Sequence, residues 1–212
     1  MGLAISTHFL ADMLANDEEG AEWFRDRLVL VNTLLVENSL PPHVEPETYG
    51  VTKARPHTSS FPYSMLHYLR RAYAHAARHP ERPLTPVSSG EDPASDPLVD
   101  SLMTNFDVHL VCHSDSEGFY VPVAFEEVIF DTEDRGLPGG MLGSTVRLMK
   151  ELVYVAPFID IALVDGQLSD RAAAVVHATA DDAPFGRERL VWLALFEAAR
   201  VSLANRTLLV FN

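Results

Sequence analysis

The sequence DVHLVCHSDSEGFYVPVAFEEVIF, residues 107–130, has the clearest strand pattern in the chain. Apolar side chains occupy every second position from Val108 to Cys112, a period typical of a half-buried strand. Polar residues from His113 to Gly118 then interrupt the pattern, and a second aromatic and β-branched run begins at Phe119. Two such runs on either side of a polar turn predict a β-hairpin over about 107–130.

Further strands are predicted near 159–164 and 207–211, where apolar residues alternate or follow one another in a short run. Helical spacing of apolar residues precedes and follows the hairpin, notably in 9–35, in 60–79 and around 190–199. Because the strands gather in the middle and the helices mostly flank them, the sequence predicts an α+β fold. Its small central sheet should be mostly antiparallel and packed by N-terminal, middle and C-terminal helices.

The chain has 212 residues, of which 47% are hydrophobic, and this is enough apolar material for one sizeable core. Residues 80–97 contain five prolines among Ser, Glu and Asp, a composition that cannot bury enough surface to order itself. The halves on either side show no complete pattern alone. We therefore expect a single globular domain over 1–212 with a mobile loop at 80–97.

The composition also predicts where in the cell the protein is located. No uncharged apolar run approaches the roughly 18 residues that a membrane helix needs, so no membrane association is expected. A single cysteine, Cys112, cannot form an intramolecular disulfide, and residues 1–8 lack the features of a secretory signal. These observations predict a cytoplasmic protein.

The net charge restricts the classes of partner that the protein can bind. Sixteen basic residues against 30 acidic residues give a formal net charge of −14. Such an excess repels nucleic acid, so general nucleic-acid binding is not expected, while basic protein surfaces are attracted. Residues 53–82 are the exception, with six basic residues and one acid. This segment either pairs with acidic neighbours inside the protein or forms an anion-binding face.

The densest group of chemically versatile side chains is His113, Asp115 and Glu117, in the predicted hairpin turn. Imidazole and carboxylate groups bind divalent metals and also serve as general acids and bases. These three residues are therefore the candidate catalytic and metal-binding residues of a small metal-assisted hydrolase. Apart from that divalent metal, no cofactor is predicted. The alternative is a solvated turn in which Asp, Ser and Gly bond to the local backbone.

A second candidate site lies in the glycine-rich segment that precedes a predicted helix. Gly143 is followed by Ser144 where a phosphate-binding loop has lysine, so a nucleotide-hydrolysing site is not expected. Free amides at a helix start can still bind an anion. Gly143 and Ser144, with Arg70 and Arg71 from the basic segment, are the candidates for an anion or nucleotide site.

No catalytic motif is complete in this sequence, and the charge is strongly acidic. The function predicted first is therefore an acidic binding or inhibitory protein, similar in charge to an immunity protein, that acts without catalysis on a basic protein partner. The metal-assisted hydrolase and the anion or nucleotide binder stay open as alternatives.

Overall fold

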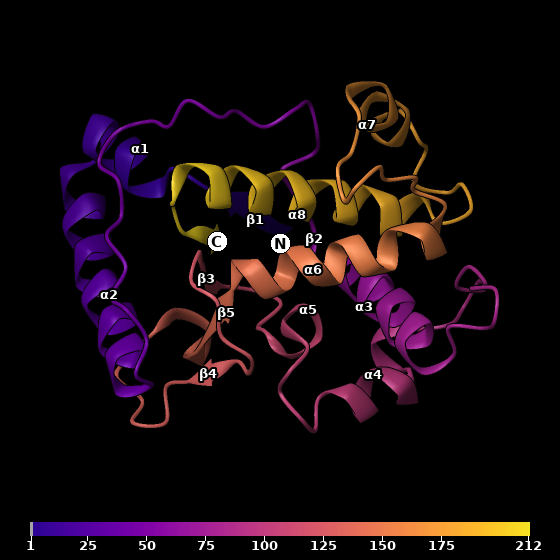
Figure 1. Ribbon diagram of the computed structural model, residues 1–212, viewed down its shortest axis with the longest axis horizontal. Coiled ribbons are helices and arrows are strands. Elements are labelled where there is room, and N and C mark those ends of the chain that lie inside the picture. The colour runs from indigo at the N-terminus through magenta and orange to yellow at the C-terminus, as the bar shows by residue number, and fades with distance from the viewer. Residues whose placement is uncertain (1) are drawn as a thin grey trace.

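The computed structural model describes residues 2–212, and within that range it contains eight α-helices and six β-strands (Figure 1). The helices are α1 (Phe9–Asn16), α2 (Glu18–Glu37), α3 (Tyr63–Arg78), α4 (Pro97–Leu102), α5 (His109–Cys112), α6 (Thr145–Val155), α7 (Asp170–His177) and α8 (Gly186–Asn205). The strands are β1 (Gly2–Ser6), β2 (Ser60–Pro62), β3 (Gly118–Val121), β4 (Ile129–Phe130), β5 (Met141–Ser144) and β6 (Leu209–Phe211). The predicted α+β class is confirmed.

The strands form one mixed sheet in the order β2-β1-β6-β3-β5-β4. Strands β3 and β5 run parallel, and the other four neighbouring pairs run antiparallel, as predicted for most of the sheet. The first and last strands pair with each other, with Ile5 opposite Phe211, so the two ends of the described chain lie close together (Figure 1). The sheet is therefore held by pairings between distant parts of the sequence.

The predicted hairpin over 107–130 is wrong in its first half. Residues 109–112 form the short helix α5, and the chain turns at Gly118, where φ is 132°. Strand β3 does begin there, but its partners are β5 and β6. The two-residue alternation is misleading here because it suggests that His109 lies on an exposed strand face. In the structure His109 is buried, as are the other three residues of α5.

The other strand predictions had mixed outcomes. The strand at 207–211 is confirmed as β6. The strand near 159–164 is wrong, because a 3₁₀ turn occupies Ala156–Ile159 and Asp160 adopts a left-handed backbone conformation with φ of 57°. Strands β1, β2 and β5 were not predicted from the sequence. Each of these depends on a distant partner strand rather than on a pattern of its own.

Helices cover both faces of the sheet. Along β3, Phe119 and Val121 pack with α2, whereas Tyr120 between them packs with the core around α6 and α8. This follows from the alternation of side chains along a strand. Helix α8 is buried at every residue from Val191 to Ala199, including Glu197, so this central stretch of the helix is covered on all sides.

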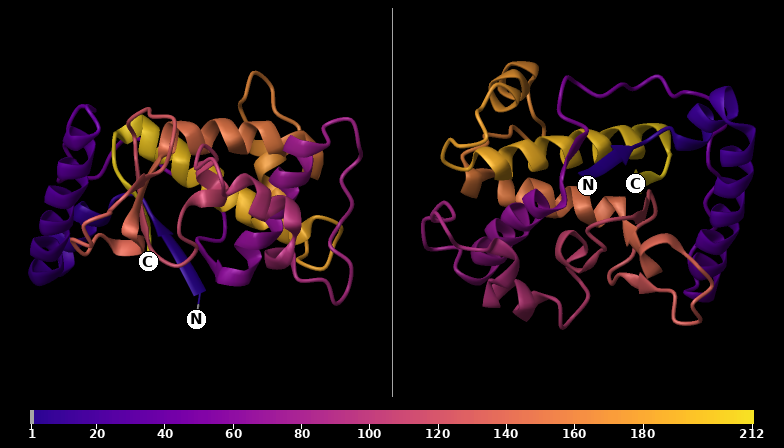
Figure 2. Two further views of the ribbon diagram at one scale, coloured as in Figure 1. Left: turned by 90° about the horizontal axis from the view of Figure 1, so that it is seen from below. Right: turned by 180° about the vertical axis from the view of Figure 1, so that it is seen from behind.

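Helix α2 is the outermost layer on its side of the sheet (Figure 2, left). Its inner face contributes Phe24, Val31, Leu34 and Leu35 to the core, and its outer face is exposed. No helix within residues 2–212 is long and apolar enough to cross a membrane. The loop at 80–97 runs irregularly to a 3₁₀ turn at Pro93–Ser95, and its mobility stays a prediction.

Candidate functional site

The three residues of the predicted metal site lie in the turn between α5 and β3. His113 is buried, and its two ring nitrogens face the carbonyl oxygens of Ser114 at 3.1 Å and Phe119 at 3.0 Å. Asp115 faces His67 at 3.2 Å, and Glu117 is exposed. In residues 2–212 no three His, Cys, Asp or Glu side chains are placed to hold one metal ion.

The surroundings of His113 favour a structural role. Its ring stacks on Tyr120 with the ring centres 4.0 Å apart, and burial lowers the pKa of His113 to about 4. A metal ligand needs an imidazole nitrogen whose lone pair is free, but both nitrogens here point at backbone oxygens. The metal-assisted hydrolase therefore stays a prediction that this arrangement does not support.

The candidate anion-binding residues are engaged inside the protein. Arg70 is buried and donates to the carbonyl oxygens of Leu110 at 2.9 Å and His113 at 2.6 Å. Arg71 donates to Thr85 and pairs with Asp96 at 3.2 Å. The guanidinium groups of Arg70 and Arg71 therefore hold neighbouring loops in place. The anion site likewise stays a prediction.

Gly143 and Ser144 are equally committed. Gly143 lies within β5 opposite Tyr120, and an added Cβ would come within 2.4 Å of the Tyr120 ring. The Ser144 amide donates to His109, and its hydroxyl donates to Val123 and accepts from the Arg147 amide. The hydroxyl therefore caps α6, while the Ser144 amide is already bonded.

The acidic and basic side chains of this protein occupy different places. Twenty-two of the 30 acidic residues are exposed, against seven of the 16 basic ones. Many arginines instead donate to backbone carbonyl oxygens of distant segments: Arg27, Arg55, Arg70, Arg71, Arg78, Arg147, Arg189 and Arg200. The arginines thus stabilise the fold, and the excess of negative charge faces solvent.

The N-terminal half of α2 concentrates this negative charge. Asp17 caps the helix by accepting from the Gly20 amide at 3.0 Å, and Glu18, Glu22 and Asp26 follow at intervals of four residues, along one side of the helix. Glu19 adds a fifth exposed carboxylate. The acids at the N-terminus are favoured by the helix dipole.

The spacing of these five carboxylates can be compared with that of phosphates. At about 1.5 Å per helical residue, residues 17–26 span roughly 13 Å, or about one carboxylate every 3 Å. One strand of DNA presents a negative charge about every 3.4 Å along its axis. Arg25, the basic residue within this stretch, is paired with Glu47 at 2.7 Å.

The C-terminal end of α2 continues the acidic surface into a loop. Arg135 pairs with Glu37 at 2.9 Å and with Glu133 at 2.8 Å, which fixes the loop against the end of the helix. Glu133 and Asp134 are exposed beside it. We define the acidic flank as the exposed carboxylates of α2 with those of this loop: Asp17, Glu18, Glu19, Glu22, Asp26, Glu37, Glu133 and Asp134.

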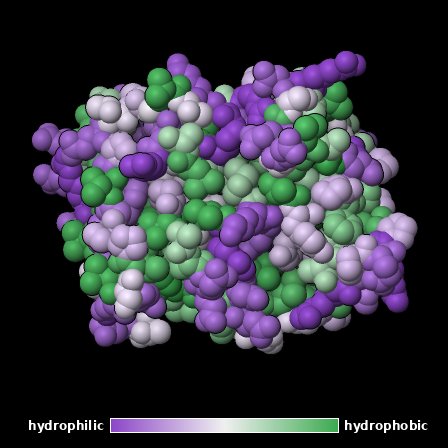
Figure 3. Space-filling model, in the orientation of Figure 1, coloured by the Kyte–Doolittle hydropathy of each residue, from purple (hydrophilic) through white to green (hydrophobic). Residues whose placement is uncertain are grey.

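Figures 1 and 3 share one orientation, and α2 lies along the left edge of the molecule in Figure 1. Hydrophilic residues gather at the upper left, beside the N-terminal half of α2 (Figure 3). Three large apolar side chains are exposed on the same helix, Trp23, Val29 and Val36. Carboxylates around exposed apolar groups are the composition of a protein-binding surface with a polar rim.

The acidic composition predicts a basic partner but does not by itself locate the residues of the acidic flank. Two signals in the sequence would have found them. Glu18, Glu22 and Asp26 are spaced for one helix side, and residues 83–134 hold twelve acids without one Lys or Arg. That second segment includes Glu133 and Asp134 of the flank.

Residues 1–211 match a family described as "Putative DNA-mimic protein". No curated protein and no solved structure matches the chain.

Proposed function

The chain belongs to this family of putative DNA-mimic proteins, and we propose that it binds a basic, DNA-binding protein by presenting the acidic flank in place of DNA. The proposal refines the binding or inhibitory role predicted from charge. We further propose that the protein acts without catalysis or a cofactor and meets its partner in the cytoplasm.

The observation behind the proposal is the row of carboxylates on α2. Its charge density along the helix, about one per 3 Å, is close to that of a single DNA strand. A protein that binds phosphates through Lys and Arg side chains offers groups that pair equally well with carboxylates. The flank and a DNA strand would therefore compete for the same basic surface.

The arginine contacts inside the protein support this role. Because Arg25 and Arg135 are paired with carboxylates, and Arg27 donates to Gly136 at 3.0 Å, the basic groups near the flank are held by the protein itself. A basic partner therefore meets a surface of mainly one sign. Such surfaces accelerate association and make it sensitive to salt.

Competition with DNA tests the proposal. Basic proteins from a cell lysate are bound to immobilised double-stranded DNA at low ionic strength, and the purified protein is then added in solution. We expect it to release particular DNA-binding proteins and to form a complex with them that dissociates at high salt. Release of none of the bound proteins would contradict the proposal.

Two variants of equal net charge locate the surface. The flank variant combines Glu18→Gln, Glu22→Gln and Asp26→Asn, and it should release the partner on the order of tenfold less effectively. The control variant combines Glu81→Gln, Asp107→Asn and Asp165→Asn, three exposed acids outside the flank. It should behave as the unaltered protein does, and equal losses in both variants would mean that the flank is not the binding surface.

A further inference from the structure

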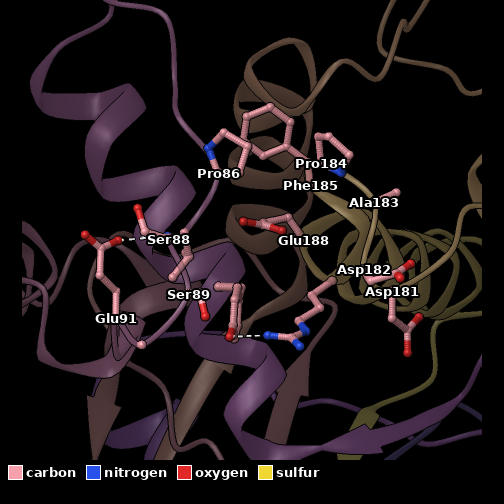
Figure 4. A pocket seen from close by; sticks show the side chains of 14 residues that line it. Pro86, Ser88, Ser89, Glu91, Asp181, Asp182, Ala183, Pro184, Phe185 and Glu188 are labelled. Atoms are coloured by element: carbon pink, nitrogen blue, oxygen red, sulfur yellow. Dashed lines mark hydrogen bonds between the residues drawn. The ribbon is translucent and has the colours of Figure 1, made fainter.

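A pocket of about 510 Å³ lies far along the chain from the acidic flank (Figure 4). One wall is the loop 86–91, and the other is the segment 181–188, which leads into α8. Tyr68 of α3 completes the lining. The volume falls in the range of about 300–1,000 Å³ that is usual for small-ligand sites.

Glu188, in the first turn of α8, has an unusual position in this pocket. Its side chain points across the pocket toward the loop that carries Ser88 (Figure 4), yet the residue is only 3% exposed. A buried carboxylate without a donor is costly, so charged groups in protein interiors are almost always paired.

The other three buried acids in residues 2–212 follow that rule. Glu45 accepts from the Leu208 amide at 2.8 Å, Glu151 accepts from two backbone amides, and Glu197 accepts from two arginines. For Glu188, the donor within the described chain is its own backbone amide. Its carboxylate opens into the pocket instead of toward a partner.

The nearby arginines are engaged elsewhere. Arg187 lies over the Tyr68 ring, 4.8 Å from its centre, and bonds to the Tyr68 hydroxyl. Arg189 pairs with Asp160 at 2.8 Å, and Arg71 pairs with Asp96. Burial raises the pKa of Glu188, while the positive charges of Arg71, Arg187 and Arg189 oppose that rise. Among the contacts of residues 2–212, none of these arginines forms an ion pair with the Glu188 carboxylate.

The rest of the lining suits a cation with an apolar stem. Three further acids, Glu91, Asp181 and Asp182, are among the lining residues, with Arg187 as the arginine in that lining, and the Glu91 carboxylate accepts from the Ser88 amide at 2.9 Å (Figure 4). The apolar lining residues are Pro86, Val87, Ala183, Pro184 and Phe185. Aliphatic stems pack against such surfaces, and aromatic rings attract cations.

We propose that this pocket binds a guanidinium or ammonium group on a flexible alkyl chain, with the Glu188 carboxylate as its counter-ion. The group could belong to a small molecule or to an Arg or Lys side chain of a protein. This inference does not rest on the acidic flank, which uses other residues.

L-Arginine and L-citrulline test the pocket, because citrulline has nearly the same shape but a neutral end group. Calorimetric titration of the unaltered protein should detect arginine and not citrulline. Glu188→Gln should weaken arginine binding about tenfold or more, the usual effect of removing a charged partner from a hydrogen bond. Asp165→Asn, which removes a charge outside the pocket, should leave it unchanged. Equal binding of the two amino acids, or no binding of either, would overturn the proposal.

Two further arms complete the test. A blocked Gly-Arg-Gly peptide is compared with agmatine: tighter binding of the peptide assigns the site to protein side chains, and tighter binding of agmatine assigns it to small molecules. Thermal unfolding of Glu188→Gln checks that the variant folds, and the citrulline comparison stands without it. The flank variant should bind arginine normally, so this proposal and the proposed function fail separately. Loss of arginine binding in the flank variant would overturn the pocket assignment.

Discussion

Leu110 donates its backbone amide to the Glu151 carboxylate at 2.6 Å, across 41 residues of sequence. The second oxygen of the same carboxylate accepts from the His109 amide at 2.9 Å. These are the first amides of α5, which would otherwise lack acceptors in a buried position. A side chain of α6 thereby stabilises a helical turn where the local pattern favours a strand.

Replacing Glu151 should therefore destabilise the protein. Glu151→Ala leaves two buried amides without acceptors, and the expected loss is roughly 2–4 kcal/mol of unfolding free energy. Denaturant unfolding monitored by circular dichroism measures it. Glu126→Ala is the control, because that side chain is exposed and its pair with Arg147 is a surface contact worth little. Equal stability of the two variants would show that the Glu151 bonds do not matter.

Stability should depend on pH through two buried histidines. Burial lowers the pKa of both His109 and His113 to about 4, below the ordinary 6.5. The unfolded chain then binds more protons than the folded one, so stability falls as pH decreases from 6.5 toward 4. Each histidine contributes on the order of 3 kcal/mol to that fall.

The contribution of Glu151 to stability depends on pH in the opposite direction. Burial raises its pKa to about 7 from 4.5, so its contribution decreases as pH rises between those values. The fall in stability on acidification should thus be steeper in Glu151→Gln than in the unaltered protein. Urea midpoints from pH 4 to 7, at high salt to screen surface carboxylates, measure both slopes. A midpoint in Glu151→Gln that does not fall on acidification would contradict the assignment to the histidines.

The pair of Glu197 with Arg55 should be another point of weakness. Glu197 is fully buried in α8 and accepts from the Arg55 amide at 2.8 Å and from its side chain at 2.9 Å. Glu197→Ala removes the carboxylate shared by Arg55 and Arg200, leaves the Arg55 amide without its acceptor, and should cost about 3–5 kcal/mol. Arg200→Ala removes a partly exposed partner of the same carboxylate and should cost less. The order of the two unfolding midpoints checks this prediction.

Binding through the acidic flank should show a graded salt dependence. Each flank carboxylate that pairs with a partner cation adds to the slope of log affinity against log salt concentration. By analogy with phosphate contacts, that slope should fall by roughly one for each carboxylate neutralised. Titrations at several salt concentrations with Glu22→Gln, and then with Glu18→Gln added, measure the change. An unaltered slope would exclude these residues from the interface.

Trp23 should act differently from the carboxylates. It is 44% exposed on α2, and aromatic residues in such positions often dominate binding energy. Trp23→Ala should accelerate dissociation of the partner and leave the salt slope as it was, because no charge is removed. Dissociation rates from surface plasmon resonance at two salt concentrations test this, and an unchanged rate would place Trp23 outside the contact.

Some properties of this protein follow from composition and local pattern. The acidic excess and the expectation of a basic partner need only residue counts. The long helices at 18–37 and 63–78 follow from apolar periodicity that their packing preserves, and the helix at 186–205 follows from a dense run of apolar residues that is buried on all sides. The turn at Gly118 and the last strand were also predictable, because turn residues and a short apolar run are local signals.

Tertiary contacts decided the rest. His109–Cys112 are helical because a carboxylate from α6 accepts their amides, and β1 exists because the last strand lies beside it. Tertiary contacts also determined the functional surfaces. Many arginines donate to carbonyl oxygens of distant segments, whereas most carboxylates are exposed to solvent. The physical reason is that pairing, burial and hydrogen bonding depend on which groups meet in space, and periodicity along the chain reports only on neighbours within a few residues.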